Sequence, residues 1–125
     1  MNKPKYSFIK NTNYALSGLK DMILTEKSFR IELILFLILN CIVFILPFKF
    51  NYKIILSLSL FIPLFSEIIN SAIERVVDLY STEYNELAKK AKDIGAFLVF
   101  LSFVVTIIIW IVILTINLNS LREIL

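Results

Sequence analysis

Three long apolar stretches dominate the chain and are separated by short polar segments. They run over Leu33–Phe48, Ile54–Ile73 and Ile94–Asn117, and each approaches or exceeds the roughly 20 residues that a helix needs to cross a bilayer. A segment in lipid must satisfy its own backbone hydrogen bonds, and strand-like alternation is absent, so helices are favoured over a barrel. The pattern predicts an all-α membrane protein, with one domain over 1–125 and transmembrane helices at 31–48, 54–78 and 94–117.

A different periodicity precedes the first apolar stretch, over residues 7–30. One side of a helix drawn through this segment would carry the apolar residues Phe8, Ala15, Leu16, Leu19, Ile23 and Leu24. The other side would carry the charged residues Lys10, Lys20, Asp21 and Lys27. This pattern predicts an N-terminal amphipathic helix on the membrane surface, and a frayed, solvated tail is the alternative.

Composition and charge agree with a membrane protein and narrow its chemistry. Hydrophobic residues make up 58% of the chain, against roughly 45–50% in soluble domains. The chain has two glycines, one cysteine and no histidine, which excludes glycine-rich phosphate loops, histidine-based triads and the HExxH metal motif. Most lysines and arginines lie before the first span and between the second and third, so we expect the N-terminus to be cytoplasmic and the C-terminus to face outward. The net charge of +3 follows this topology, and no nucleic-acid partner is expected.

The stretch SEIINSAIERVVD, residues 66–78, breaks the apolar character of the second span. At 100° per residue, Glu67, Asn70, Glu74 and Asp78 fall on one helical face, with Glu67 deepest in the membrane. A charge at the bilayer centre costs at least ~2.5–3.5 kcal/mol, so these acids must face other helices, water or a ligand. We interpret the face as an ionisable site at the cytoplasmic membrane boundary. Polar contacts that only hold helices together are the alternative.

Further charged residues fall at the same membrane level, namely Glu26, Glu32, Glu83, Glu86, Lys92 and Asp93. Carboxylates suit a hard cation such as Mg²⁺, which takes substrate phosphates as its other ligands. A carboxylate in an apolar setting suits a general base. Together these are the parts of a phosphoryl-transfer site, although their spacing alone does not establish that reaction.

The segments TEKSFRIE, EIINSAIERVVD and EYNELAKKAKDIGA resemble the prokaryotic integral-membrane diacylglycerol kinase family. The family pattern E-x-x-N-[ST]-A-I-E-x-x-V-D, followed by A-K-D, is met by residues 67–78 and 91–93, and the resemblance runs from about residue 8 to residue 114. It implies a homotrimer in the bacterial inner membrane, with active sites between subunits. It also implies phosphorylation of a lipid alcohol by ATP with Mg²⁺.

The resemblance also implies a role for each candidate residue. Glu67 would be the catalytic base, Glu26 and Glu74 would hold the metal, and Asn70 and Asp78 would orient the site. Lipid-substrate contacts would come from Arg30, Glu32 and Trp110 besides Glu67. The ATP-binding residues would be Tyr14, Glu83, Tyr84, Asn85, Glu86, Lys92 and Asp93.

Kinases of two lipid alcohols, diacylglycerol and undecaprenol, share this pattern. Glu32, Ser71, Glu86 and Trp110 match the diacylglycerol type, so we expect diacylglycerol as the substrate and phosphatidic acid as the product. Two features depart from the pattern: Ser7 stands where the family often has arginine, and Pro63 lies inside the second span, where a kink about one turn before Glu67 is expected. A small oligomeric proton or cation channel, or a scaffold subunit, is the alternative outside the kinases.

Overall fold

The structure, a computed structural model, describes residues 7–80 and 83–122, and helices account for nearly all of them. The all-α prediction is confirmed for this described part of the chain. Three helical runs are long and apolar enough to cross a membrane, namely Lys27–Ile45, Phe50–Tyr80 and Glu86–Ile116. The helices in chain order are α1 (Phe8–Thr25), α2 (Lys27–Ile45), α3 (Phe50–Ser59), α4 (Phe61–Tyr80), α5 (Glu86–Ile116) and α6 (Leu118–Arg122).

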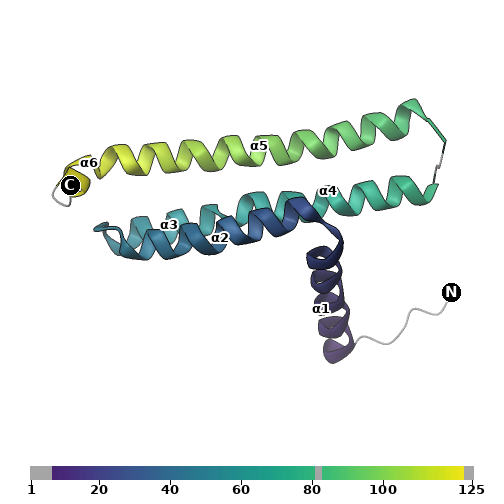
Figure 1. The fold of residues 1–125 in the computed structure, drawn as a ribbon, viewed down its shortest axis with the longest axis horizontal. Helices are drawn as coiled ribbons and strands as arrows, with labels where there is room; N and C mark the ends of the chain where they lie inside the picture. Colours follow the sequence, from purple (N-terminus) through teal and green to yellow (C-terminus); the bar gives the residue numbers. More distant parts are fainter. Residues whose placement is uncertain (1–6, 81–82, 123–125) are drawn as a thin grey trace.

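The long helices form an antiparallel bundle, and α1 lies crosswise to it (Figure 1). The end of α1, the end of α4 and the start of α5 come to the same end of this bundle, which we call the charged end. At 31 residues α5 is about 46 Å long, so it exceeds a ~30 Å hydrocarbon core and extends beyond it. A crosswise α1 at the level where the spans leave the apolar zone is the arrangement expected of a surface helix.

Glu26 separates α1 from α2 and corrects the predicted boundary between the surface helix and the first span. Its backbone is extended, with φ −98° and ψ 111°, so the chain turns there and residues 27–30 begin α2. The far end of α2 also comes earlier than predicted, at Ile45. Pro47 explains this end, because a residue before proline is disfavoured in the helical region, and Leu46 has ψ 144°.

The second span is divided at Leu60 into α3 and α4, one turn before Pro63. Proline has no N–H to donate to the carbonyl four residues earlier, which here belongs to Ser59. Thr106 of α5 takes over this role, since its hydroxyl donates to that carbonyl at 3.3 Å. The division lies one turn before the proline at which a kink was expected, and the neighbouring span supplies the missing donor.

Two apolar clusters lie at opposite ends of the bundle. Val43, Phe48, Leu56 and Ile113 are buried together at the end away from α1. Met22, Phe29 and Leu64 are buried where α1, α2 and α4 meet. Between α4 and α5 the contact is polar instead, and the Ser66 hydroxyl donates to the Ser102 hydroxyl at 2.7 Å. Small polar residues allow two membrane helices to approach closely, which aligns the acidic face of α4 with α5.

Candidate active site

The acidic face of α4 runs from the interior of the bundle to the charged end. Glu67 is 5% exposed and Asn70 is 9% exposed, whereas Glu74 is half-buried and Asp78 is exposed. Glu67 and Asp78 are about 16 Å apart along the helix axis, at 1.5 Å per residue. The gradient of burial agrees with the predicted order of depth, with Glu67 deepest.

Asn70 and Glu74 are paired on successive turns of α4, and the Asn70 amide donates to Glu74 Oε1 at 3.1 Å. The Asn70 oxygen is buried and has no hydrogen-bond partner among the described residues. It faces Gly95 of α5, where an added Cβ would overlap it. Glycine at 95 therefore permits the packing of Asn70 between the two helices.

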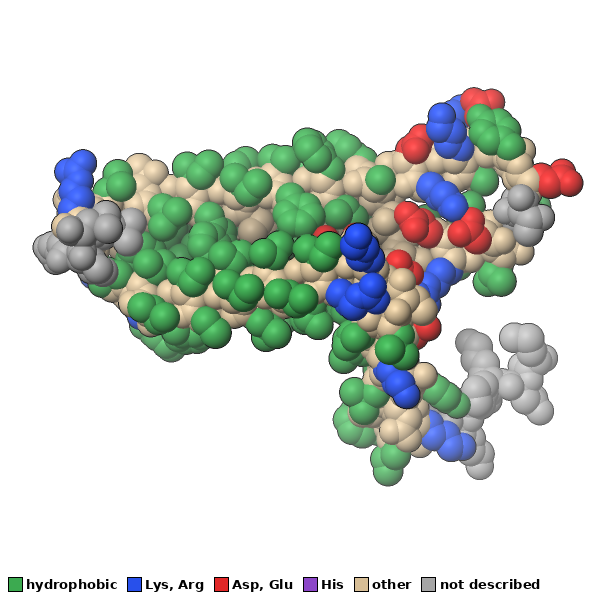
Figure 2. Space-filling view, viewed as in Figure 1, with side chains coloured by type: hydrophobic (Ala, Val, Ile, Leu, Met, Phe, Trp, Pro, Cys, Tyr) green, Lys and Arg blue, Asp and Glu red, His purple; other side chains and the backbone are tan. Residues whose placement is uncertain are grey.

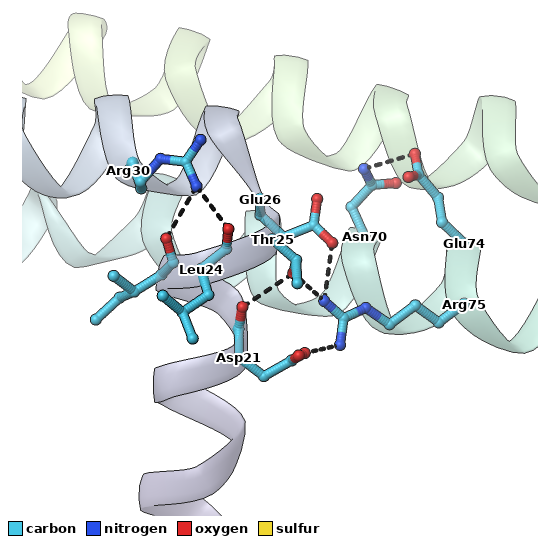
Figure 3. Close-up of polar contacts among 9 residues, drawn as sticks. Asp21, Leu24, Thr25, Glu26, Arg30, Asn70, Glu74 and Arg75 are labelled. Carbon is cyan, nitrogen blue, oxygen red and sulfur yellow. Dashed lines mark hydrogen bonds and ion pairs between the residues drawn. The ribbon is translucent and has the colours of Figure 1, made fainter.

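Arg75 connects α4 to the end of α1 (Figure 3). Its guanidinium donates to the carboxylate of Asp21, to Thr25 Oγ1 at 2.7 Å and to Glu26 Oε1 at 2.9 Å. Glu26, predicted as a metal ligand, is thereby held beside the residue that follows Glu74 in the chain. The structure thus brings the two predicted metal-ligating residues to one region.

The connection between α4 and α5 gathers the second group of candidates at the charged end. Lys92 Nζ is 2.6 Å from Asp78 Oδ1, and this ion pair joins α5 to the end of α4. Asn85 caps α5, because its side chain accepts from the backbone N–H groups of Leu87 at 2.8 Å and Ala88 at 3.2 Å. The other predicted ATP-binding residues are exposed in the single chain: Tyr14, Glu83, Tyr84, Glu86 and Asp93.

An apolar groove of about 270 Å³ lies between α2, α4 and α5. Glu32, Pro63, Leu64 and Trp110 are among its lining residues. Glu32 is buried, its Oε2 has no partner among the described residues, and its carboxyl interacts electrostatically with that of Glu67. The groove is therefore apolar along most of its length and acidic at Glu32.

Two of the predicted lipid contacts have local structural partners. Arg30 donates to the carbonyls of Ile23 at 2.9 Å and Leu24 at 3.0 Å, and so caps the end of α1. The Trp110 indole N–H donates to Ser59 Oγ at 3.1 Å. Arg30 lies near the turn between α1 and α2, whereas Trp110 lines the groove from α5.

The donor set at the charged end fits Mg²⁺ as a cation shared with phosphates. The described residues contain no group of three or more Asp, Glu, Cys or His side chains that could hold a metal by themselves. Mg²⁺ is commonly held by one or two carboxylates, with phosphates and water completing its six ligands. Glu26, which follows α1, and Glu74 of α4 are the two carboxylates that would hold such an ion (Figure 3).

Sequence reasoning missed the contacts of Asp21, Thr25, Arg75 and Gly95. A cation inside an apolar helix, directly after Glu74, was the signal for Arg75. Its partners belong to a helix about 50 residues earlier in the chain, so periodicity within one helix could not identify them. Gly95 carried the weaker signal of a glycine near the start of a predicted helix.

The charged side chains of the visible face gather over α1, the end of α4 and the start of α5, and apolar side chains cover most of the rest (Figure 2). This arrangement places a buried carboxylate next to an apolar groove and places further carboxylates and a lysine next to water. A lipid with a reactive hydroxyl and a water-soluble anionic co-substrate could meet there.

A family model described as prokaryotic diacylglycerol kinase matches residues 13–114. Proteins named diacylglycerol kinase are similar to this chain in Escherichia coli K12, with 35% identity over 106 residues, and in Haemophilus influenzae, with 39% over 103 residues. A third, from Helicobacter pylori, is 35% identical over 97 residues. These alignments cover 85%, 82% and 78% of this chain and 87%, 86% and 76% of the respective relatives.

Proposed function

Because the chain belongs to the prokaryotic diacylglycerol kinase family, and is therefore a kinase, we propose that it transfers the γ-phosphate of ATP to the hydroxyl of diacylglycerol. The product is phosphatidic acid. The reaction takes place at the cytoplasmic face of the bacterial inner membrane, where the lysine-rich segments lie. The N-terminus is cytoplasmic and the C-terminus faces outward.

One observation carries this proposal: Glu67 is buried about one turn of α4 beyond Leu64, which lines the apolar groove together with Glu32. An acyl chain fits an apolar groove between membrane helices. A glycerol hydroxyl attached to it would then lie at the level of Glu67. A buried carboxylate that serves only packing would be costly, since an amide or hydroxyl could make the same hydrogen bonds more cheaply.

In the proposed reaction Glu67 accepts the proton of the lipid hydroxyl. The hydroxyl oxygen attacks the γ-phosphorus in line, a new P–O bond forms, and the bond to the β-phosphate oxygen breaks so that ADP leaves. Glu32, close to Glu67, contacts the lipid headgroup. Arg30 and Trp110 contact the lipid at the two ends of this region.

The nucleotide lies at the charged end in this proposal. Glu26 and Glu74 would hold Mg²⁺, which would neutralise charge on the phosphates. Lys92 contacts the phosphates as a point charge, and Asn70 and Asp78 orient Glu74 and Lys92 through the hydrogen bond and ion pair described above. The remaining nucleotide contacts come from Tyr14, Glu83, Tyr84, Asn85, Glu86 and Asp93.

The test is phosphate transfer from labelled ATP by the purified protein in mixed micelles. Diacylglycerol and undecaprenol are offered separately, each with Mg²⁺ and with a chelator. We expect strong labelling of diacylglycerol that the chelator abolishes. Labelling of undecaprenol instead would keep the site but change the substrate. Absence of transfer to either lipid, from a folded protein, would contradict the kinase proposal and favour a channel or scaffold.

Exchange of Glu67 for glutamine tests the assignment of the base. Glu67→Gln keeps the shape of the side chain but cannot accept the proton, so we expect transfer to fall by at least about 100-fold. Thermal unfolding in the same micelles checks that the fold is kept. Thr115→Val is the control, since the exposed Thr115 hydroxyl bonds to a carbonyl of its own helix near the end of α5 that lies away from the charged end. Full activity of Glu67→Gln would show that another group takes the proton.

A further inference from the structure

The guanidinium of Arg75 makes three polar contacts with the end of α1 and the residue that follows it. One nitrogen pairs with Asp21, and the other donates to Thr25 Oγ1 at 2.7 Å and Glu26 Oε1 at 2.9 Å. Thr25 is itself fixed, because its hydroxyl donates to the Asp21 carbonyl at 2.9 Å. Arg75 therefore holds the last turn of α1 and the extended residue that follows it (Figure 3).

Little else fixes α1 against α4. Met22 is the single buried residue of α1, and it packs with Phe29 and Leu64. The remaining apolar side chains of α1, such as Phe8 and Leu16, are 73% and 58% exposed. Arg30 ties the end of α1 to α2 through the Ile23 and Leu24 carbonyls, but apolar packing at one point still leaves α1 free to tilt against α4. A forked donor with three acceptors at the adjacent turn removes this freedom.

The network also fixes the carboxylate of Glu26. Its Oε1 accepts from Arg75, and its side chain is 27% exposed. A carboxylate has a second oxygen with its own lone pairs, which can bind a cation while Oε1 stays on the guanidinium. Because Arg75 lies next to Glu74 in the sequence of α4, the contact ties Glu26 to the helix that carries the other predicted metal-ligating residue.

We propose that Arg75 is a positioning residue, which docks α1 on α4 and aims Glu26 toward a divalent cation that Glu74 also binds. This inference rests on the proposed function for the role of Glu26 and Glu74. Removing a residue that hydrogen-bonds to a metal ligand and orients it typically lowers metal affinity about 10–100-fold. A merely structural ion pair at this exposure would contribute little to stability and nothing to metal use.

Metal activation curves of the full-length protein in mixed micelles test this role. For Arg75→Gln we expect the Mg²⁺ concentration at half-maximal activity to rise about tenfold, with kcat at saturating Mg²⁺ within about twofold of the wild type. Arg75→Lys should lie between, because lysine keeps the charge but not the planar fork that reaches three acceptors. Lys20→Gln removes a nearby positive charge from the exposed side of α1 and should leave the curve unchanged.

An unchanged or lower Mg²⁺ requirement in Arg75→Gln would overturn the inference, since a lower one would mean that the guanidinium competes with the cation. A fall in kcat alone would also overturn it.

Hydrogen exchange of the α1 amides gives a readout that does not depend on activity. Arg75→Gln should speed exchange in the last turn of α1, Met22–Thr25, at least severalfold and leave α5 unchanged. Unaltered α1 exchange would overturn the docking role even if the protein is an active kinase. A wild type without phosphate transfer, but with the expected change in exchange, would instead reject the proposed function and keep the docking contact.

Discussion

Asn70 shows how a single residue can depend on a contact that lies outside its own helix. Its amide donates to Glu74, and its oxygen is packed against the Cα of Gly95 on the next span. A side chain at 95 would push Asn70 away from α5, and the Asn70–Glu74 hydrogen bond would move with it. The position of a predicted metal ligand on α4 therefore depends on the absence of a side chain on α5.

Gly95→Ala should reduce phosphate transfer on the order of 10- to 100-fold, because small misplacements of a reacting group are that costly. Overpacking should also lower the free energy of unfolding, by about 1–3 kcal/mol. The measurement is kinase activity beside thermal unfolding. Gly18→Ala is the matched control, since a Cβ at Gly18 would meet no atom within 4 Å.

A double variant tests whether Gly95→Ala lowers activity by displacing Asn70. In an Asn70→Ala background the added Cβ has no amide to displace, so Gly95→Ala should cause no further loss of activity. Additive losses would mean that the alanine acts through some other contact of α5.

At the residue scale, the sequence was sufficient to place the acidic residues on one face of a helix. It was not sufficient to identify the residues of other helices that contact this face. Glu67, Asn70, Glu74 and Asp78 fall on one face because helical periodicity is a local property. The partners of Asn70 and Arg75 come from α5 and α1, and their identity depends on how separate helices pack. One sequence carries no information on that packing.

At the scale of elements, the division between α3 and α4 depends on a donor from α5. The Thr106 hydroxyl donates to the carbonyls of Ser59 at 3.3 Å and Ser102 at 2.9 Å, and it is buried. Trp110 donates to the Ser59 hydroxyl one turn further along α5. A proline in a membrane helix is tolerated when a neighbouring helix satisfies the carbonyl that it leaves free. Pro63 was visible in the sequence, but Thr106 as its compensation was not.

Thr106→Val keeps the shape of the side chain and removes the donor, so the Ser59 carbonyl loses its partner on α5. We expect the free energy of unfolding in micelles to fall by about 1 kcal/mol. Thr115→Val is the matched control, because the Ile111 carbonyl of the same helix is the one hydrogen-bond partner of the exposed Thr115 hydroxyl among the described residues. Equal stability of the two variants would show that the Ser59 carbonyl needs no donor from α5.

At the scale of the whole molecule, the predicted nucleotide-binding residues of a single chain lie exposed on its surface and do not enclose a binding site. Tyr14 and Tyr84 are 71% and 84% exposed, and Asp93 is exposed on α5 beside the half-buried Lys92. Apolar side chains are also exposed along α2 and α5, where lipid or another subunit can cover them. Both features agree with the homotrimer and shared active sites that the sequence resemblance implies, and we keep that assembly as a proposal.

The shared-site assembly predicts that two inactive variants can complement one another. Glu67→Gln lacks the base and Asp93→Asn lacks a nucleotide contact, so each homotrimer should transfer little phosphate. If one chain supplies Glu67 and another supplies Asp93, random mixing in a trimer leaves about one quarter of the sites with both native residues, since each is native in half of the chains. We expect that fraction of wild-type activity after the two variants are dissociated and reassembled together. Mixing without reassembly is the control. Activity that stays at the level of the separate variants, in trimers of verified mass, would place both residues of each site on the same chain.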